Sequence, residues 1–503
     1  MTATRTPGQP FVDDGRLVST NPATGDEVGR FPVATAAEVE AAVSRAREAG
    51  AWWSGLGFAG RRARLHEFRA VLARRMPELA AVMRREGGKP EVDAIVEIAG
   101  AIDHVHWASN NARRVLRSRR VRPSPLQLEF SARLEYQPLG VIGVIGPWNY
   151  PVFTPLGSIA YALAAGNAVV YKPSEYTPAV GQWLVERFAE VVPEQPVLQI
   201  VYGRGETGAA LCRAGVDKVA FTGSTATGKL VMAACAETLT PVLVECGGKD
   251  AMIVDADADL SAAADAALWG GVYNAGQTCI GIERVYVVES VADEFVGKLV
   301  SAAKGLKVGF ADDSTVGPIT MPSQVEVIRR HIADAVDSGA TVALGGIEAV
   351  RPPYVDPTIL VDVPESSSAV REETFGPVLV VNRVEDAEEA LQRANAVSYG
   401  LGGAVFCGSP DRALDLARRM RSGMTAVNSA LSFAGQPSVP FGGVGDSGFG
   451  RIHGDDGLRE FTRPKSITSR RMRSLLPATT FRRDPAATAK RLTKIIRLVH
   501  GRG

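Results

Sequence analysis

Five short apolar segments between residues 141 and 245 alternate with stretches of helical periodicity, and this alternation constrains the fold more than any other feature. The gaps hold helical patterns such as residues 178–191 and 225–237. Strands that alternate with helices predict βαβ units and a parallel sheet, which binds ligands beyond the carboxyl ends of its strands. The five expected strands are 141–145, 168–171, 197–202, 218–221 and 241–245.

The rest of the chain predicts further helices and a second α/β region. Its 503 residues exceed one compact core, so two or three domains are expected. Helical patterns cover residues 35–50, 60–86 and 91–116, and a second α/β region spans roughly 248–440, with strand-like segments at 251–255, 284–288 and 376–382. Two further segments, 126–137 and 460–470, look like exposed strands.

Charge and cysteine content narrow the class of protein. The net charge of +1 argues against a nucleic-acid binder, although residues 463–503 hold twelve Lys and Arg and one acid, and so carry +11. Five scattered cysteines without metal-ligand spacing indicate a reducing compartment and no metal site. The first residues lack the apolar core of a signal peptide, and no uncharged apolar run approaches ~18 residues, so we expect a cytoplasmic protein.

Glycine-rich patterns offer candidate phosphate-binding loops. Residues 203–208 and 443–448 both match GxGxxG, but neither has the full sequence context of a dinucleotide fingerprint, and 52 glycines make chance matches expected. Residues 221–229 (FTGSTATGK) are more informative, because a strand ends, a glycine turn follows and a helix begins with small hydroxylated residues. An ordinary capped helix is the alternative interpretation.

Cys279 and Glu245 are the candidate reactive groups. Cys279 falls in a glycine-containing polar loop after a predicted helix over 261–273. A lone cysteine is more often structural, and this alternative stays open. Glu245 ends an apolar strand beside two glycines, where it can reach a ligand or merely pair with Lys249. The six histidines lie outside these loops, which argues against a Cys-His dyad and a His-ligated metal.

Eight ordered motifs resemble the aldehyde dehydrogenase superfamily over roughly residues 15–470. They are GPWNYP at 146–151, YKPSE at 171–175, FTGSTATG at 221–228, ECGGK at 245–249, GQTC at 276–279, EETFGPV at 372–378, Asn428, and PFGGVGDSGFGR at 440–451. The His453-Gly454 that follows is similar to members acting on apolar or fatty aldehydes and to some bacterial semialdehyde enzymes. One departure is Cys246, where the family usually has leucine.

The resemblance implies catalytic, cofactor and substrate roles. It makes Cys279 the nucleophile, Glu245 the base for deacylation, and the Asn149 amide with the Cys279 N–H the oxyanion hole. The implied cofactor-binding residues are Ile145, Pro147, Trp148, Lys172, Ser174, Glu175, Gly205, Gly223, Ser224, Gly228, Gly247, Glu373 and Phe375. The implied substrate-pocket residues are Tyr150, Phe153, Gly157, Thr278, Ile280 and Phe433.

The resemblance also implies an α/β fold with a parallel-sheet dinucleotide-binding domain, an α/β catalytic domain and a small β oligomerisation arm. The expected domains are residues 1–122 and 141–246 for NAD binding, 247–442 for the thiol chemistry, 123–140 and 458–470 for oligomerisation strands, and 471–503 for a basic tail.

The expected reaction is oxidation of an aldehyde to the carboxylic acid with NAD and water. Glu175 favours NAD over NADP, because a carboxylate repels the 2′-phosphate, although Lys172 offsets part of this repulsion. The expected pocket residues are mostly apolar or aromatic and include no Arg or Lys, so an alkyl or aryl aldehyde is favoured over a semialdehyde. A CoA-acylating enzyme is a second alternative, but such members generally lack the glutamate, and a non-catalytic scaffold usually loses the cysteine or the base.

Assembly and the tail complete the expectations. Exposed strands at 126–137 and 460–468 predict pairing with a neighbouring chain, and hence a homodimer or homotetramer. Within 486–500, Leu492, Ile495, Ile496 and Val499 form one apolar stripe on a basic helix. Such a helix can lie on an anionic membrane, but we favour packing of the stripe against protein, since it is narrow and lacks an aromatic anchor.

Overall fold

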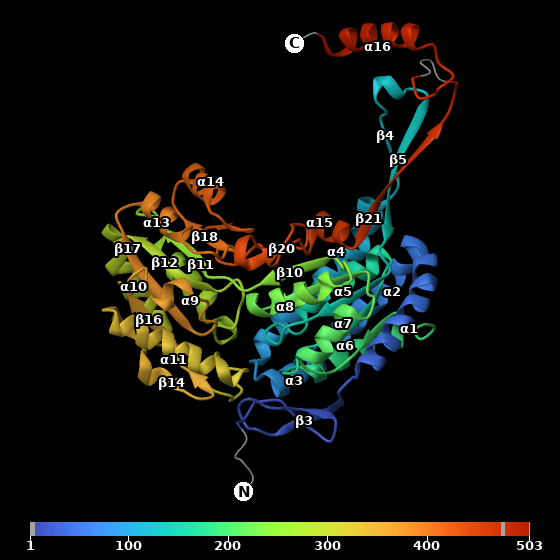
Figure 1. Cartoon of the computed structure of the whole chain (residues 1–503). Coiled ribbons are helices and arrows are strands. Elements are labelled where there is room, and N and C mark those ends of the chain that lie inside the picture. Colours follow the sequence, from blue (N-terminus) through green and yellow to red (C-terminus); the bar gives the residue numbers. More distant parts are fainter. Residues whose placement is uncertain (1–5, 474–477, 502–503) are drawn as a thin grey trace. The chain divides into compact units, whose positions relative to one another are not determined.

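The five apolar segments of residues 141–245 form parallel neighbouring strands of one sheet, as the alternating pattern predicts (Figure 1). The computed structural model of the chain describes residues 6–473 and 478–501. The sheet consists of β6 (Val141–Ile145), β7 (Ala168–Lys172), β8 (Leu198–Ile200), β9 (Lys218–Gly223), β10 (Val242–Cys246) and the antiparallel edge strand β20 (Gly448–Phe449).

The strand order of this sheet, β20-β10-β9-β6-β7-β8, places a ligand crevice. The chain runs outward from β6 through β7 to β8, then returns to add β9 and β10 on the other side, so the order reverses between β6 and β9. A crevice at the carboxyl ends of the strands at such a switch point is where open α/β sheets bind ligands. β6 and β7 are wholly buried, because helices cover both faces.

Nine helices, among those that the structure describes, accompany this sheet: α1 (Ala36–Gly55), α2 (Gly57–Arg74), α3 (Met76–Gly87), α4 (Glu91–Leu116), α5 (Phe153–Ala165), α6 (Pro178–Val191), α7 (Gly205–Arg213), α8 (Thr225–Ala236) and α15 (Gly454–Glu460). Thr35 begins α1 with a capping box, in which its hydroxyl and the Glu38 carboxylate satisfy each other's backbone N–H groups. The prediction of one helix over 60–86 is wrong, because the chain breaks at Arg75 and restarts with Pro77 in the first turn of α3.

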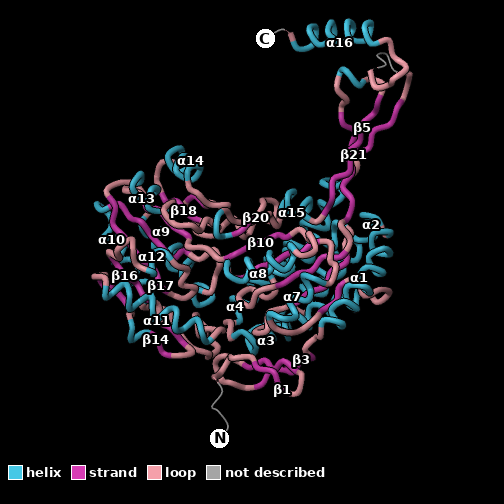
Figure 2. Tube along the Cα trace, viewed as in Figure 1, coloured by secondary structure: helices cyan, strands magenta, loops and turns pink. Residues whose placement is uncertain are grey.

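A second sheet has the order β13-β16-β17-β12-β11-β18-β19 and is parallel except at β13. Its strands are β11 (Asp250–Val254), β12 (Ile282–Val288), β13 (Thr341–Leu344), β16 (Thr358–Val361), β17 (Val378–Val384), β18 (Gly403–Phe406) and β19 (Ala426–Val427). Helices α9 (Leu260–Val272), α10 (Glu289–Ala303), α11 (Pro322–Asp337) and α12 (Ser368–Arg371) share one core, while α13 (Ala387–Ala394) and α14 (Pro410–Arg419) share the core on the other face (Figure 2). The predicted strands at 251–255, 284–288 and 376–382 are confirmed within a few residues.

Two small sheets were not predicted from the sequence. β1 (Phe11–Asp13), β2 (Arg16–Thr20) and β3 (Glu27–Pro32) form an antiparallel sheet, and β14 (Val350–Arg351) pairs with β15 (Tyr354–Val355). These strands are short, so they carry too few residues for a clear alternation of apolar and polar side chains.

By its contacts the chain divides into two units. Unit 1, which holds the sheets described so far, comprises Met1–Val115 and Pro138–Thr462, and unit 2 comprises Leu116–Gln137 and Arg463–Gly503. Unit 2 contains a sheet of order β21-β5-β4, from β4 (Arg119–Val121), β5 (Phe130–Pro138) and β21 (Thr462–Arg470). The strand predicted over 126–137 starts late, because Pro125 begins a 3-10 turn.

The basic tail ends in a helix, α16 (Pro485–His500), which confirms the helix predicted over 486–500. Leu492 and Ile495 are half-buried, whereas Ile496 and Val499 are exposed. Among the described residues, no helix combines the length and the apolar character needed to cross a bilayer.

Candidate active site

A cavity of about 400 Å³ opens at the switch point of the first sheet, where a dinucleotide is expected. Nine of the predicted cofactor residues line it: Ile145, Pro147, Trp148, Lys172, Ser174, Glu175, Gly205, Gly223 and Ser224. Ser224 caps α8 by accepting the Thr227 N–H, and an anion suits such a helix N-terminus. A Cβ at Gly205 would meet no atom within 4 Å, so the cavity is open there.

Four other residues predicted to bind the cofactor, Gly228, Gly247, Glu373 and Phe375, do not line this cavity. Gly228 lies deeper in α8, where a Cβ would lie 3.1 Å from the Cys246 sulfur. Glu373 accepts the Gly248 N–H at 3.1 Å, and a Cβ on Gly247 would lie 2.0 Å from its Oε1. The Phe375 ring lies edge-on to Trp148, which lines the cavity, with centroids 5.5 Å apart.

The loop that presents Cys279 has an unusual backbone. Asn274, Ala275 and Gly276 have φ values of 55°, 57° and 71°, a left-handed conformation that costs free energy in residues other than glycine. Only glycine fits at position 276, because a Cβ there would lie 2.2 Å from the carbonyl carbon of Gly376. The loop is therefore held in a strained shape by its surroundings, which is typical of functional sites.

Glu245 and Cys279 come together in a buried environment, although 33 residues separate them in sequence. The Cys279 thiol lies next to the Glu245 carboxyl group, and both side chains line one cavity. Burial raises the pKa of Glu245 to about 7, and burial with the nearby Glu245 charge raises the pKa of Cys279 well above its ordinary value. Among the described residues, Oε1 of Glu245 has no hydrogen-bond partner. A carboxyl group that titrates near 7 suits general base catalysis.

The structural alternative for Glu245, pairing with Lys249, does not occur. Lys249 forms a buried ion pair with Glu283 and donates to the Thr374 hydroxyl at 3.0 Å. Successive side chains of a strand point to opposite faces, and Cys246 accordingly faces α8 while Glu245 faces Cys279. Burial raises the pKa of the Cys246 thiol to about 12, which disfavours its thiolate at neutral pH.

Asn149 lies against the same loop. Its side-chain amide donates to the Gln277 carbonyl at 3.0 Å, which leaves one amide N–H for a further acceptor. The main-chain carbonyl of Asn149 accepts from the Lys89 ammonium at 2.8 Å and from the Asn274 side-chain amide at 3.1 Å. The amide is therefore fixed in orientation next to the thiol loop.

A second cavity, of about 540 Å³, contains Cys279 and Glu245 in its wall. Four of the predicted substrate-pocket residues line it: Tyr150, Phe153, Thr278 and Ile280. Gly157 and Phe433 are not among the residues that line it. Gly157 contacts the buried His453 ring, where a Cβ would lie 2.6 Å from Nε2, and the Phe433 ring packs on Gly402.

Several lining residues were missed because they come from helices distant in sequence. Val96, Glu97 and Gly100 of α4, together with Asp265, Ala266 and Trp269 of α9, line the larger cavity. In the cofactor cavity the missed residues include Tyr176, Arg204, Thr227 and Met321. The residues of α4 and α9 are three or four positions apart, and this helical spacing was visible in the sequence. Nothing local, however, shows which face of a helix meets a cavity.

The two GxGxxG patterns have different outcomes. In the first, Gly205 and Gly208 line the cofactor cavity. In the second, Gly448 belongs to β20 beside Glu245, and a Cβ there would lie 2.1 Å from the Val244 carbonyl oxygen. This glycine allows two backbones to approach closely and has no contact with the cofactor cavity.

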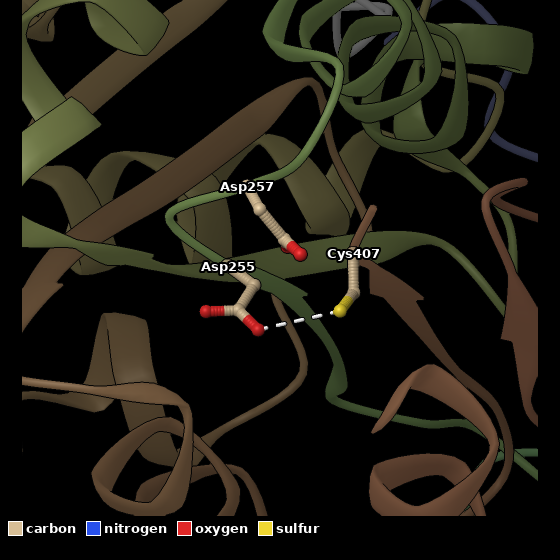
Figure 3. A group of neighbouring side chains, drawn as sticks. All are labelled: Asp255, Asp257 and Cys407. Atoms are coloured by element: carbon tan, nitrogen blue, oxygen red, sulfur yellow. Dashed lines mark hydrogen bonds between the residues drawn. The ribbon is translucent and has the colours of Figure 1, made fainter. Parts of the chain in front are cut away.

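Asp255, Asp257 and Cys407 form the one group of side chains among the described residues that could hold a metal ion (Figure 3). The Cys407 thiol donates to Asp255 at 3.3 Å, and Arg412 pairs with Asp255 at 3.0 Å. Asp257 accepts the Gly408 N–H at 2.8 Å. Arg412 already supplies the compensating cation, so this group is explained without a metal.

Comparison with known proteins agrees with this geometry. The model of the aldehyde dehydrogenase family matches residues 11–467. A 4,4'-diapolycopene aldehyde oxidase of Methylomonas sp. is 38% identical over 91% of this chain and 86% of its own length. A provisionally named NADP(+) succinate-semialdehyde dehydrogenase of Mycobacterium ulcerans is 35% identical over 95% and 92%. The solved NAD-dependent aldehyde dehydrogenase of Sinorhizobium meliloti superposes with a TM-score of 0.88 at 32% identity, covering 94% of this chain and 95% of that one. The chain therefore belongs to the aldehyde dehydrogenase family and is an NAD(P)-dependent oxidoreductase that acts on aldehydes.

Proposed function

We propose that this protein oxidises an apolar alkyl or aryl aldehyde to the carboxylic acid with NAD and water, through a covalent intermediate on Cys279. One observation carries the proposal: a buried carboxyl group with an unpartnered oxygen, Glu245, lies beside a cysteine in the wall of an apolar cavity.

In the first half of the reaction Cys279 adds to the aldehyde carbon. Glu245 accepts the thiol proton, because it is the neighbouring base and its pKa of about 7 lets it be ionised at neutral pH. The free N–H of Asn149 donates to the oxyanion of the thiohemiacetal. Bound NAD supplies the hydride acceptor, and a thioester on Cys279 remains.

In the second half Glu245, after releasing the thiol proton to solvent, removes a proton from the water that attacks the thioester. Cys279 leaves as the thiolate and takes that proton back from Glu245, which restores the starting state. The residues of the smaller cavity are those that would hold the dinucleotide, with the pyrophosphate at the N-terminus of α8 near Ser224 and the adenosine ribose near Lys172 and Glu175.

The charges around the larger cavity favour an apolar substrate over a semialdehyde. Its charged lining residues, among those described, are Glu97, Glu245 and Asp265, all of them acidic, and its other walls are mainly aromatic and aliphatic. A carboxylate-bearing aldehyde would find no cation there and would be repelled by Asp265 at the exposed rim. This favours a substrate class like that in the name of the Methylomonas relative over that in the name of the Mycobacterium ulcerans relative.

We propose NAD as the preferred cofactor, because the Glu175 carboxylate lines the dinucleotide cavity and would repel a 2′-phosphate bound beside it. Lys172 is 3.9 Å from Glu175, and Arg204 also lines this cavity, so two cations moderate the preference. Some use of NADP is expected.

The experiment that tests the function is NADH absorbance with aldehydes of graded chain length and charge, with and without CoA. We expect octanal and benzaldehyde to react faster than succinate semialdehyde, and the product to be the free acid. If acyl-CoA were the main product, hydrolysis through Glu245 would be wrong. A faster reaction with succinate semialdehyde would contradict the apolar pocket.

We further propose that the sheet of unit 2 pairs with a neighbouring chain and gives a homodimer or homotetramer. An arm of three strands leaves edges that proteins seldom leave unpaired in solution. Sedimentation at micromolar concentration should show a species larger than the 53.3 kDa monomer.

A further inference from the structure

A buried charged cluster beside the larger cavity, with Glu97 in its wall, has no part in the chemistry proposed above. It consists of Lys89, Asp93 and Glu97, at the start of α4, and all three residues are buried. Asp93 and Glu97 are four residues apart, so they lie on one face of the helix. Burying an ion pair contributes little to stability compared with apolar residues of similar shape, so the cluster calls for another reason.

Lys89 and Glu97 form an ion pair, and each also contacts the loop that carries Asn149. Lys89 donates to the Asn149 carbonyl at 2.8 Å, and its ammonium lies 4.2 Å from the centre of the Tyr150 ring. Glu97 accepts the N–H groups of Val152 and Phe153, at 2.8 and 3.0 Å, at the beginning of α5. The pair therefore holds this loop from both ends.

Asp93 connects the same helix to the cysteine loop. Its main-chain carbonyl accepts the Tyr273 hydroxyl at 3.2 Å, and its buried carboxyl group faces the backbone of Asn274. The Asn274 side chain in turn donates to the Asn149 carbonyl at 3.1 Å and to the Gln277 carbonyl at 3.2 Å. One turn of α4 thus fixes the two loops that present Asn149 and Cys279.

We propose that Lys89 and Glu97, with Asp93, are positioning residues that hold the free N–H of Asn149 at the oxyanion of the thiohemiacetal. This inference rests on the proposed function, since it assumes that Asn149 donates to that oxyanion. Lys89 and Asp93 line neither cavity, whereas Glu97 lines the larger one. The cluster acts on Asn149 through the main-chain carbonyl of Asn149 and the backbone of Asn274. A shift of about 1 Å in a donor is enough to lower a rate roughly 100-fold.

The test is the rate of the first turnover, measured as NADH formed after rapid mixing with saturating aldehyde. Lys89→Met should lower this rate about tenfold or more, with an unchanged dissociation constant for NAD. The variant that combines Lys89→Met with Glu97→Gln removes both members of the ion pair, so it should fold better than Lys89→Met alone and still react slowly. Lys89→Arg should restore part of the rate, because it keeps the charge.

Lys218→Met is the matched control. Lys218 is also a buried lysine in an ion pair, with Glu460, but its partners are remote from both reactive loops. Its loss should lower the thermal midpoint and leave the first-turnover rate within about twofold.

A double-mutant cycle with Asn149→Ala separates positioning from a merely structural role. Asn149→Ala alone should lower the first-turnover rate by about 100-fold. Added to it, Lys89→Met should lower the rate by less than about twofold, because the group through which Lys89 acts is gone. The positioning role would be overturned if the fold losses in rate of Lys89→Met and Asn149→Ala multiplied in the double variant. It would also be overturned if the variant with both Lys89→Met and Glu97→Gln kept the wild-type rate. A wild-type rate in Asn149→Ala would overturn the oxyanion role in the proposed function instead.

Discussion

Replacing Glu245 with glutamine should abolish efficient deacylation and at the same time stabilise the protein at high pH. The side chain is 2% exposed and burial raises its pKa from 4.5 to about 7, so its ionised form is disfavoured in the folded state. The contribution of the protonated Glu245 to the stability of the folded protein is fully present below about pH 4.5 and is lost as the pH rises through about 7. This difference in pKa corresponds to roughly 3 kcal/mol at high pH. Glutamine does not titrate, so it avoids that loss.

The assay is the thermal midpoint of Glu245→Gln and wild type, compared near pH 5.5 and near pH 8.5. The free energy of unfolding of the variant should exceed that of wild type by roughly 1 kcal/mol at the lower pH and by roughly 3 kcal/mol at the higher one, and its thermal midpoint should rise accordingly. Glu326→Gln, on the exposed side of α11, is the control and should shift neither midpoint. A gain that is the same at both pH values, or a loss at the higher pH, would refute the reasoning. In rapid mixing, the same variant should slow thioester hydrolysis more than the first formation of NADH, because solvent can take the thiol proton but is a poor base for the attacking water. A burst of NADH, slower than in wild type, should therefore precede slow turnover.

Three further predictions concern the nucleophile, the cofactor and the tail. Cys279→Ala should abolish NADH formation and leave NAD binding nearly intact in calorimetry, whereas Cys407→Ala should retain activity; more than trace turnover in the first variant would contradict the assignment. Glu175→Gln should raise kcat/KM for NADP relative to NAD by about tenfold, because it removes the charge facing the 2′-phosphate; an unchanged ratio would argue that Arg204 and Lys172 set the preference. A chain truncated before Pro485 should match the full chain in having negligible liposome binding while changing oligomer size or KM; liposome binding by the full chain alone would favour the membrane interpretation.

Much of the first sheet could be predicted from the sequence, because burial on both faces leaves continuous apolar runs. The segment at 141–145 coincides with β6, and the helix at 178–191 coincides with α6. The error at Arg75 arose because apolar and basic residues continue through a break whose only local marker is Pro77. The short strands of the N-terminal sheet left no periodicity to read.

The sequence by itself determined the family motifs and the chemical type of the candidate groups. A thiol in a glycine-containing loop and a carboxylate at a strand end are local features, so Cys279 and Glu245 could be named without coordinates. The glycine at position 276 is likewise local, although its reason, the Gly376 carbonyl carbon 2.2 Å from where a Cβ would lie, is not.

Only the tertiary structure decided what these groups experience. It places Glu245 beside Cys279 and pairs Lys249 with Glu283. Because Lys249 is paired elsewhere, Glu245 is available as a base and does not form a structural ion pair. The tertiary structure also forms part of the wall of the larger cavity from α4 and α9. The physical reason is that pKa, hydrogen bonding and cavity shape depend on which side chains meet across distant segments, whereas periodicity and motifs depend only on neighbours along the chain.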